Sequence, residues 1–261
     1  MSAIILDQDI IHYEVLGRGR PVLFIHGWVG SWRYWIPMMQ AASMAYRAYA
    51  LDLYGFGDTV KSPHYNLVSQ AELVAGFLEK LGVGKVALVG HGLGAMVSLL
   101  FALRNPGVVD RIMAVGFPLE EAMVAGRLRN NPPVELAESL LGKTPLAEPV
   151  VTDAAKTDPQ AVSGSLTGLA GQYAAGLWSQ LNTACLLVHG SNDPLVQPPR
   201  SDQAGSFPSQ AHLILFDGAG HFPMIDDSSK FNRLMNDFLA LDSGESPQQL
   251  QLKDEWKRRV R

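Results

Sequence analysis

The stretch Val89-Gly90-His91-Gly92-Leu93-Gly94-Ala95 decides how this chain folds. An apolar run, residues 85–89, precedes it, and a largely apolar run with helical character, residues 95–105, follows it. This pattern predicts a buried strand that turns sharply into a helix. Gly90 and Gly94 favour such a turn, because a side chain at either position would obstruct the close packing of the helix on the strand.

Strand-length apolar runs alternate with helical patterns along the chain, which indicates βα units and a mostly parallel sheet. Strands are predicted near residues 3–6, 10–16, 21–26, 46–52, 85–90, 110–116, 184–190 and 211–216. Helices are predicted near residues 33–44, 69–81, 94–105, 196–205 and 228–241. The short link between the first two strands predicts an antiparallel pair, because a parallel pair needs a longer crossover. The expected fold class is therefore α/β, with an eight-stranded, mostly parallel sheet flanked by helices.

One segment, residues 117–183, interrupts this alternation. It contains six prolines, short helical patterns and enough leucine and aromatic residues to pack against a core. We interpret it as a helical cap over the strand ends. It would be inserted between two parts of one core, residues 1–116 and 184–241. Residues 242–261 form a C-terminal tail that could contain a short helix.

The composition is that of an ordinary globular protein. A length of 261 residues fits one α/β domain, and a net charge of −4 gives no reason to expect nucleic acid as a partner. The single cysteine, Cys185, excludes an internal disulfide and fits a cytoplasmic setting. Neither a signal peptide nor an integral membrane segment is expected. The expected partner is a small-molecule substrate or ligand, and no oligomeric state is predicted.

Two side chains suited to acid–base chemistry follow later strands. Asp193 lies in the loop after the strand at 184–190, and His221 lies in the loop after the strand at 211–216. The carboxyl ends of parallel strands share one edge of a sheet, so these side chains can meet beside Gly92. A hydrogen bond from the imidazole to the carboxylate would leave the other ring nitrogen free as a base. Asp193 could instead cap the turn that follows it.

Four motifs, taken together, resemble those of a known family. They are Phe24-Ile25-His26-Gly27-Trp28, Leu51–Thr59, the Gly90–Gly94 turn, and the loops of Asp193 and His221. From about residue 10 to 241 the chain resembles the α/β-hydrolase superfamily, with a cap of the kind seen in esterases, epoxide hydrolases and haloalkane dehalogenases. The resemblance implies that Gly90–Gly94 is a G-x-S-x-G nucleophile elbow in which Gly92 replaces the serine.

The same resemblance implies a set of oxyanion and substrate-binding positions. These are Gly27, Trp28 and Leu93, where the backbone N–H groups of Trp28 and Leu93 would be the two donors to an oxyanion. Together with Gly92, Asp193 and His221, they form the predicted active site. Two such preorganised donors stabilise developing negative charge by a few kcal/mol each.

Glycine at the nucleophile position limits the possible chemistry. Gly92 has no side chain to form a covalent intermediate, which excludes the esterase, dehalogenase and epoxide-hydrolase routes at this position. One hypothesis is weak hydrolysis of a small, largely apolar ester-like substrate, in which His221 activates a water or a substrate hydroxyl. A second is a non-catalytic ligand-binding or scaffold protein. A third is a serine hydrolase in a form whose nucleophile has been inactivated. The apparent Asp193–His221 pair favours the first, since a scaffold needs neither an acid nor a base.

The remaining histidines suggest no metal centre. His26 and His91 are interpreted as structural, and the others, His12, His64, His189 and His212, as surface or strand residues. No pair of histidines has the spacing or the acidic company of a metal site, so neither a metal nor another cofactor is expected.

Overall fold

A computed structural model describes residues 2–142, 144–145, 147–167, 180–200 and 207–252 of the chain. One sheet contains eight strands in the order β1-β2-β4-β3-β5-β6-β7-β8. The strands are β1 (Ser2–Leu6), β2 (Asp9–Gly17), β3 (Arg20–Ile25), β4 (Tyr46–Leu51), β5 (Val86–His91), β6 (Val109–Val115), β7 (Ala184–Gly190) and β8 (Ala211–Phe216). β2 pairs antiparallel with β1 and β4, and the other neighbours pair in parallel. The predicted α/β class and mostly parallel sheet are confirmed.

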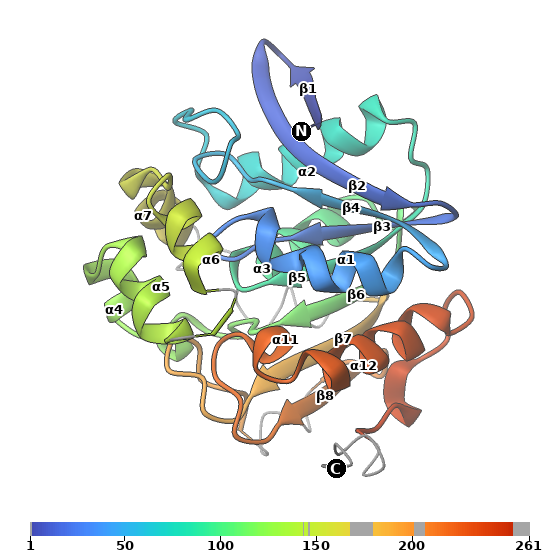
Figure 1. Ribbon diagram of the computed structural model, residues 1–261. Helices are drawn as coiled ribbons and strands as arrows, with labels where there is room; N and C mark the ends of the chain where they lie inside the picture. The colour runs from blue at the N-terminus through green and yellow to red at the C-terminus, as the bar shows by residue number, and fades with distance from the viewer. Residues whose placement is uncertain (1, 143, 146, 168–179, 201–206, 253–261) are drawn as a thin grey trace.

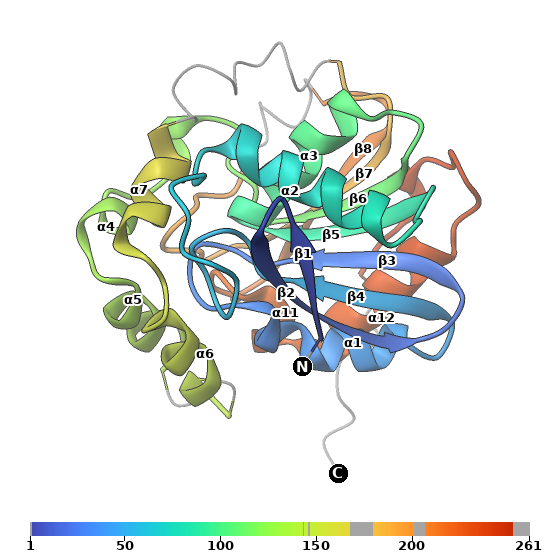
Figure 2. The same cartoon turned by 90° about the horizontal axis from the view of Figure 1, so that it is seen from above.

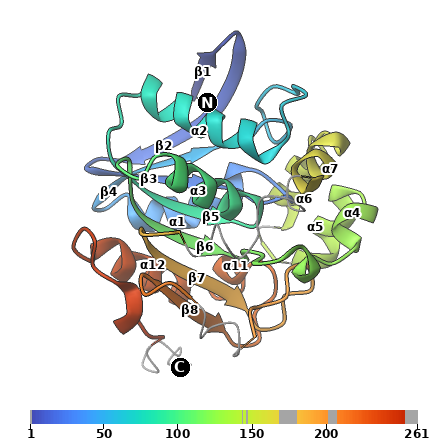
Figure 3. The same ribbon diagram turned by 180° about the vertical axis from the view of Figure 1, so that it is seen from behind.

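Helices cover both faces of the sheet. The helical elements are η1 (Trp32–Trp35), α1 (Ile36–Ala42), α2 (Leu67–Lys80), α3 (Leu93–Arg104), η2 (Glu121–Met123), α4 (Arg127–Asn130), α5 (Pro133–Leu141), α6 (Ala147–Ala154), α7 (Pro159–Thr167), α11 (Pro223–Asp226), α12 (Ser228–Ala240) and η3 (Pro247–Gln249). α2 and α3 lie on one face, and α1, α11 and α12 lie on the other (Figures 1 and 2). Figure 3 shows the face that α2 and α3 cover. Because helices cover both faces, every residue of β5 and β7 is buried.

The short helices α4 to α7 lie together at the edge where β3 ends (Figure 2). We refer to α6 and α7, with the residues between them, as the α6–α7 segment (147–167). A bridge between Val124 and Val196 joins the beginning of this region to the loop after β7. The exact limits of the predicted cap, residues 117 and 183, stay a prediction.

One predicted helix is wrong in its described part. Residues 196–200 are not helical, and the rest of the predicted range, 201–206, lies outside the described residues. Val196 pairs instead with Val124 in the isolated bridge. Pro198 and Pro199 explain the difference, since proline lacks the N–H that a helix needs and disfavours helical geometry in the residue before it.

The C-terminal tail folds back on β8 as far as it is described. The His212 imidazole and the Leu250 carbonyl approach to 2.9 Å, and Gln248 donates a hydrogen bond to the Ala211 carbonyl. The tail contains the short turn η3, while most of the helix predicted beyond it falls on residues 253–261, outside the described residues. In the described part of the chain, no helix has the length and apolar character needed to cross a membrane.

Candidate active site

Gly92 stands at the turn between β5 and α3. Its backbone angles, φ 50° and ψ −109°, lie where residues with a Cβ are strained. Its N–H donates to the Val115 carbonyl at 2.8 Å, which fixes the turn against β6. A Cβ at Gly90 would collide with the backbone of Gly94, as the close packing of helix on strand requires. The turn therefore keeps the geometry of an elbow although its central residue has no side chain.

Asp193 and His221 meet beside this turn. His221 Nδ1 donates to Asp193 Oδ2 at 2.9 Å, and both residues are buried. The other carboxylate oxygen accepts from the N–H groups of Leu195 and Val196 at 2.8 and 3.0 Å. The predicted pair and the alternative turn cap are thus both present, one on each oxygen of the same carboxylate. The capping bonds orient the carboxylate towards the imidazole.

The charge of Asp193 is stabilised in this environment. Burial by itself would raise its pKa, but the His221 imidazole and the two backbone donors outweigh burial and lower the pKa to about 2. Asp193 is therefore a carboxylate at neutral pH and can only accept a hydrogen bond from His221 Nδ1. The second ring nitrogen, His221 Nε2, is buried and has no hydrogen-bond partner among the described residues. A buried polar atom without a partner calls for an explanation, and a role in proton transfer is one.

A buried chain of hydrogen bonds holds both sides of the site. The Gly27 N–H donates to Tyr34 Oη at 2.6 Å, and the Tyr34 hydroxyl donates to His91 Nδ1 at 3.0 Å. His91 Nε2 then donates to the carbonyl of His221 at 2.9 Å. Burial lowers the pKa of His91 well below its ordinary value, which keeps the ring neutral and able to accept from Tyr34. Sequence reasoning missed this role of Tyr34, because its partners Gly27 and His91 lie in other segments of the chain.

The two predicted oxyanion donors have free N–H groups within the described part of the chain. Leu93 is the first residue of α3, and the first N–H groups of a helix have no partner inside the helix. The N–H of Trp28 donates to none of the described residues, in contrast to the N–H of Gly27, which is taken by Tyr34. Such N–H groups can donate hydrogen bonds to a negatively charged atom of a ligand.

The side chain of Trp28 lies against the elbow. It is fully buried, and its Nε1–H donates to Ser165 Oγ on α7 at 3.0 Å. A Cβ placed on Gly92 would lie 3.0 Å from both Cε3 and Cζ3 of this indole. Carbon atoms in favourable contact are 3.5–4.0 Å apart, so Trp28 would have to move to admit a side chain at position 92.

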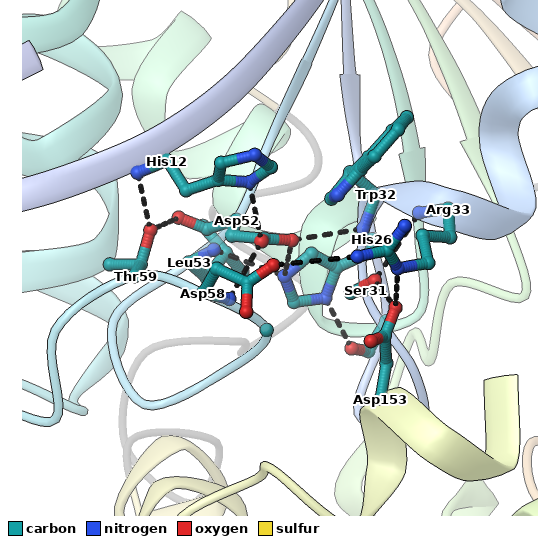
Figure 4. Close-up of polar contacts among 12 residues, drawn as sticks. His12, His26, Ser31, Trp32, Arg33, Asp52, Leu53, Asp58, Thr59 and Asp153 are labelled. Carbon is teal, nitrogen blue, oxygen red and sulfur yellow. Dashed lines mark hydrogen bonds and ion pairs between the residues drawn. The ribbon is translucent and has the colours of Figure 1, made fainter. Parts of the chain in front are cut away.

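A second polar cluster contains one histidine, His12, with two carboxylates. One ring nitrogen of His12 and one carboxylate oxygen each of Asp52 and Asp58 lie within 4.8 Å of one another (Figure 4). Asp52 already accepts from His12 Nδ1 at 2.9 Å and from the N–H groups of Trp32 and Asp58 at 2.9 and 3.0 Å. Burial opposes the charged form of His12, but the neighbouring carboxylates outweigh burial and raise its pKa. The cluster could accept a cation chemically, yet its donors mainly satisfy Asp52 and fix the loops around it.

Three other buried polar residues, His26, His189 and Ser98, occupy structural positions. His26 donates from Nδ1 to the Gly27 carbonyl and accepts the Leu53 N–H at Nε2. His189 is fully buried on β7, where burial lowers its pKa to about 4. Ser98 is buried and bonds to the carbonyl of Gly94, one turn back along α3. None of these three side chains extends the Asp193–His221 pair.

The alpha/beta hydrolase family matches residues 22–234, and the chain belongs to this family. Among its curated relatives is the 2-hydroxy-6-oxo-2,4-heptadienoate hydrolase of Pseudomonas putida, 28% identical over 253 residues that cover 87% of this chain and 91% of the relative. The 2-hydroxymuconate semialdehyde hydrolase of a Pseudomonas species is 28% identical over 252 residues, covering 86% of this chain and 88% of the relative.

Solved structures share the fold. An esterase from Thermogutta terrifontis superposes with a TM-score of 0.75 at 22% identity, over 88% of this chain and 93% of the esterase. A hydrolase from Pseudomonas aeruginosa superposes with a TM-score of 0.79 at 19% identity, over 92% of this chain and 98% of that protein. The predicted α/β-hydrolase fold is confirmed.

Proposed function

We propose that this protein binds a small, largely apolar ester-like substrate and hydrolyses it weakly by general-base catalysis, without an acyl-enzyme. One observation carries the proposal: His221 Nε2 is buried and unpartnered among the described residues, while Nδ1 is fixed by Asp193. An oriented, unprotonated imidazole nitrogen is the group that accepts a proton from an attacking water. The family relatives are named as hydrolases, which supports the reaction class.

The proposed reaction proceeds in two steps. His221 Nε2 takes a proton from a water while the water oxygen attacks the ester carbonyl, and the N–H groups of Trp28 and Leu93 stabilise the resulting oxyanion. The tetrahedral intermediate then expels the alcohol, which takes the proton back from Nε2. Throughout, Asp193 stabilises the protonated imidazole without accepting its proton.

The expected rate is low because the covalent route is absent. In serine hydrolases that lose a member of the triad, the oxyanion hole and substrate binding leave about 10³–10⁴-fold catalysis over water. Gly92 imposes a similar limit here, since it offers no nucleophile. The reaction should also lack a burst of the released alcohol, which only an accumulating acyl-enzyme produces.

Turnover of a small activated ester, with lactone and epoxide panels beside it, tests the proposal. The expected result is ester hydrolysis above the buffer rate, without a burst, that falls by about tenfold or more in His221→Ala. His64→Ala is the matched control, because His64 is exposed and lies outside the site. Equal rates in the unmodified chain and His221→Ala would contradict the catalytic role of the pair.

A non-catalytic ligand-binding protein is the second candidate. The position of the Trp28 indole favours ligand binding over catalysis, because the indole lies next to Gly92 and fills space at the elbow. Ligands of the same panel would then raise the melting temperature without being converted.

We also propose a cytoplasmic location, which the single, buried cysteine supports.

A further inference from the structure

Trp28 connects the elbow to a helix far away in the sequence. Its indole edge lies against Gly92, and its Nε1–H bonds to Ser165 on α7, 137 residues further along the chain. Ser165 is fully buried, and its own hydroxyl donates to the Val162 carbonyl at 2.8 Å. The hydroxyl oxygen is therefore fixed in an orientation in which it can accept from Trp28. The hydrogen bond between Trp28 and Ser165 therefore has a defined geometry at both its donor and its acceptor.

The α6–α7 segment is docked on core loops by further polar contacts. The Asp158 N–H donates to the Gly55 carbonyl at 2.8 Å, and the Tyr65 hydroxyl donates to the Asp158 carboxylate at 2.8 Å. Next to α6, Arg33 Nε and the buried carboxylate of Asp153 form an ion pair at 2.8 Å (Figure 4). These contacts hold the segment in place, so Ser165 is a fixed anchor for the indole.

Trp28 must give way when another group occupies the space beside Gly92. The indole carbons lie 3.0 Å from the position of a Cβ, so the ring has to shift by a few tenths of an ångström to admit that atom, whereas a ligand bound over the elbow needs more room than such a shift provides. A rotation of the side chain would clear this space, but it would break the bond to Ser165. The Trp28 backbone N–H, the predicted oxyanion donor, would stay in place during such a rotation.

We propose that Trp28 is a gate over the elbow, and that its hydrogen bond to Ser165 holds the gate shut. Access to Gly92 then depends on the α6–α7 segment, because the anchor belongs to that segment. The gate selects ligands that can displace or stack on the indole. This proposal concerns access alone and holds whether a bound ligand is hydrolysed or only retained.

A thiol placed at the elbow reports on access without requiring catalysis. The chain has one cysteine, Cys185, which is buried with a raised pKa, so a thiol introduced by Gly92→Cys is the only one expected to react with a small reagent such as iodoacetamide. The labelling rate of Gly92→Cys is measured alone and combined with Ser165→Ala, with Trp28→Phe, and with both. Phenylalanine keeps an aromatic ring but lacks the Nε1–H.

The gate predicts that Ser165→Ala and Trp28→Phe each accelerate labelling by about tenfold, and that the double change adds little to either. Ser163→Ala is the matched control on the same helix, because Ser163 is exposed and bonds to the Gln160 carbonyl. It should leave the rate unchanged. Equal rates in all backgrounds would overturn the proposal, as would equal acceleration by Ser163→Ala.

Folding of the probe variant provides a second readout. The Gly92→Cys variant can fail to fold by itself and yet fold when it is combined with Ser165→Ala or Trp28→Phe. In that case the release of the indole has made room for the cysteine side chain, as the gate requires. If the variant fails to fold in every background, releasing Trp28 has no effect on the elbow, and the gate is contradicted. Neither result depends on hydrolysis, so a failure here is distinct from a failure of the proposed reaction.

Discussion

Glycine at position 92 is favoured by two independent features of its surroundings. Its φ of 50° belongs to a region that residues with a Cβ rarely adopt, and the Trp28 indole lies 3.0 Å from where a Cβ would be, closer than ordinary contact. The neighbouring groups nevertheless keep the arrangement that a nucleophile would use. Asp193 fixes His221, and a chain through Tyr34 fixes the His221 backbone. The loss is confined to one side chain.

Replacing this glycine should reduce stability. We expect Gly92→Ser to lower the free energy of unfolding by about 1–3 kcal/mol, because serine adds backbone strain and a contact with Trp28. Gly82→Ser is the control, since Gly82 also has a positive φ, 66°, but nothing lies within 4 Å of its Cβ position. Urea unfolding measures both changes. A Gly92→Ser variant that is no less stable than Gly82→Ser would contradict the contact with Trp28.

The charged form of Asp193 should stabilise the folded protein, and this stabilisation should be lost at acidic pH. Its folded pKa of about 2 is below the unfolded value of 3.8, so its contribution is complete above about pH 4 and is lost as pH falls towards 2. Asp193→Asn should flatten the pH dependence of the unfolding free energy in that window and reduce ester turnover by up to the loss expected for His221→Ala, about tenfold. Asp217→Asn, on an exposed loop residue, is the control. An unchanged slope between pH 4 and 2 would argue against a charged Asp193 in the folded state.

At the scale of the elements, the sheet was the most predictable part. All eight strands lie within a residue or two of their expected ranges, because each is a short apolar run bounded by turn residues. The Asp193–His221 contact was predictable too, since both loops follow parallel strands. The contacts of Trp28 with Ser165 and of Tyr34 with His91 were not, because they depend on how distant helices and loops pack. No local pattern encodes such pairings.

Cys185 on β7 should be chemically silent in the folded protein. The thiol is fully buried, and burial raises its pKa far above the ordinary value. We expect no reaction with a disulfide reagent such as dithionitrobenzoate at neutral pH until urea unfolds the chain, whereupon one thiol per chain reacts. Rapid reaction of the native protein would show that β7 opens locally, contrary to the burial of every residue in this strand.

At the scale of the whole molecule, the core contains several neutral histidines. Burial lowers the pKa values of His26, His91 and His189, in the last case to about 4. The unfolded chain binds protons at these residues near pH 6.5, whereas the folded chain does not. The folded state should therefore lose stability as pH falls from about 6.5 to 4.

One substitution isolates this effect. His189→Asn should reduce the slope of the unfolding free energy against pH by about one proton between pH 6.5 and 4, although it lowers stability at neutral pH. His64→Asn, the same substitution at an exposed position, is the control. The measurement is a series of urea unfolding curves at half-unit pH intervals. A slope that His189→Asn does not alter would mean that the folded protein protonates His189 normally.

The proposed reaction requires a working base at an elbow that lacks its nucleophile. The most direct test restores the serine and releases Trp28 together, in Gly92→Ser/Ser165→Ala, and measures hydrolysis of a small activated ester. We expect activity about tenfold or more above that of the unmodified chain, with a burst of released alcohol, and we expect this activity to be lost when His221→Ala is added. Identical background activity with and without His221 would contradict it.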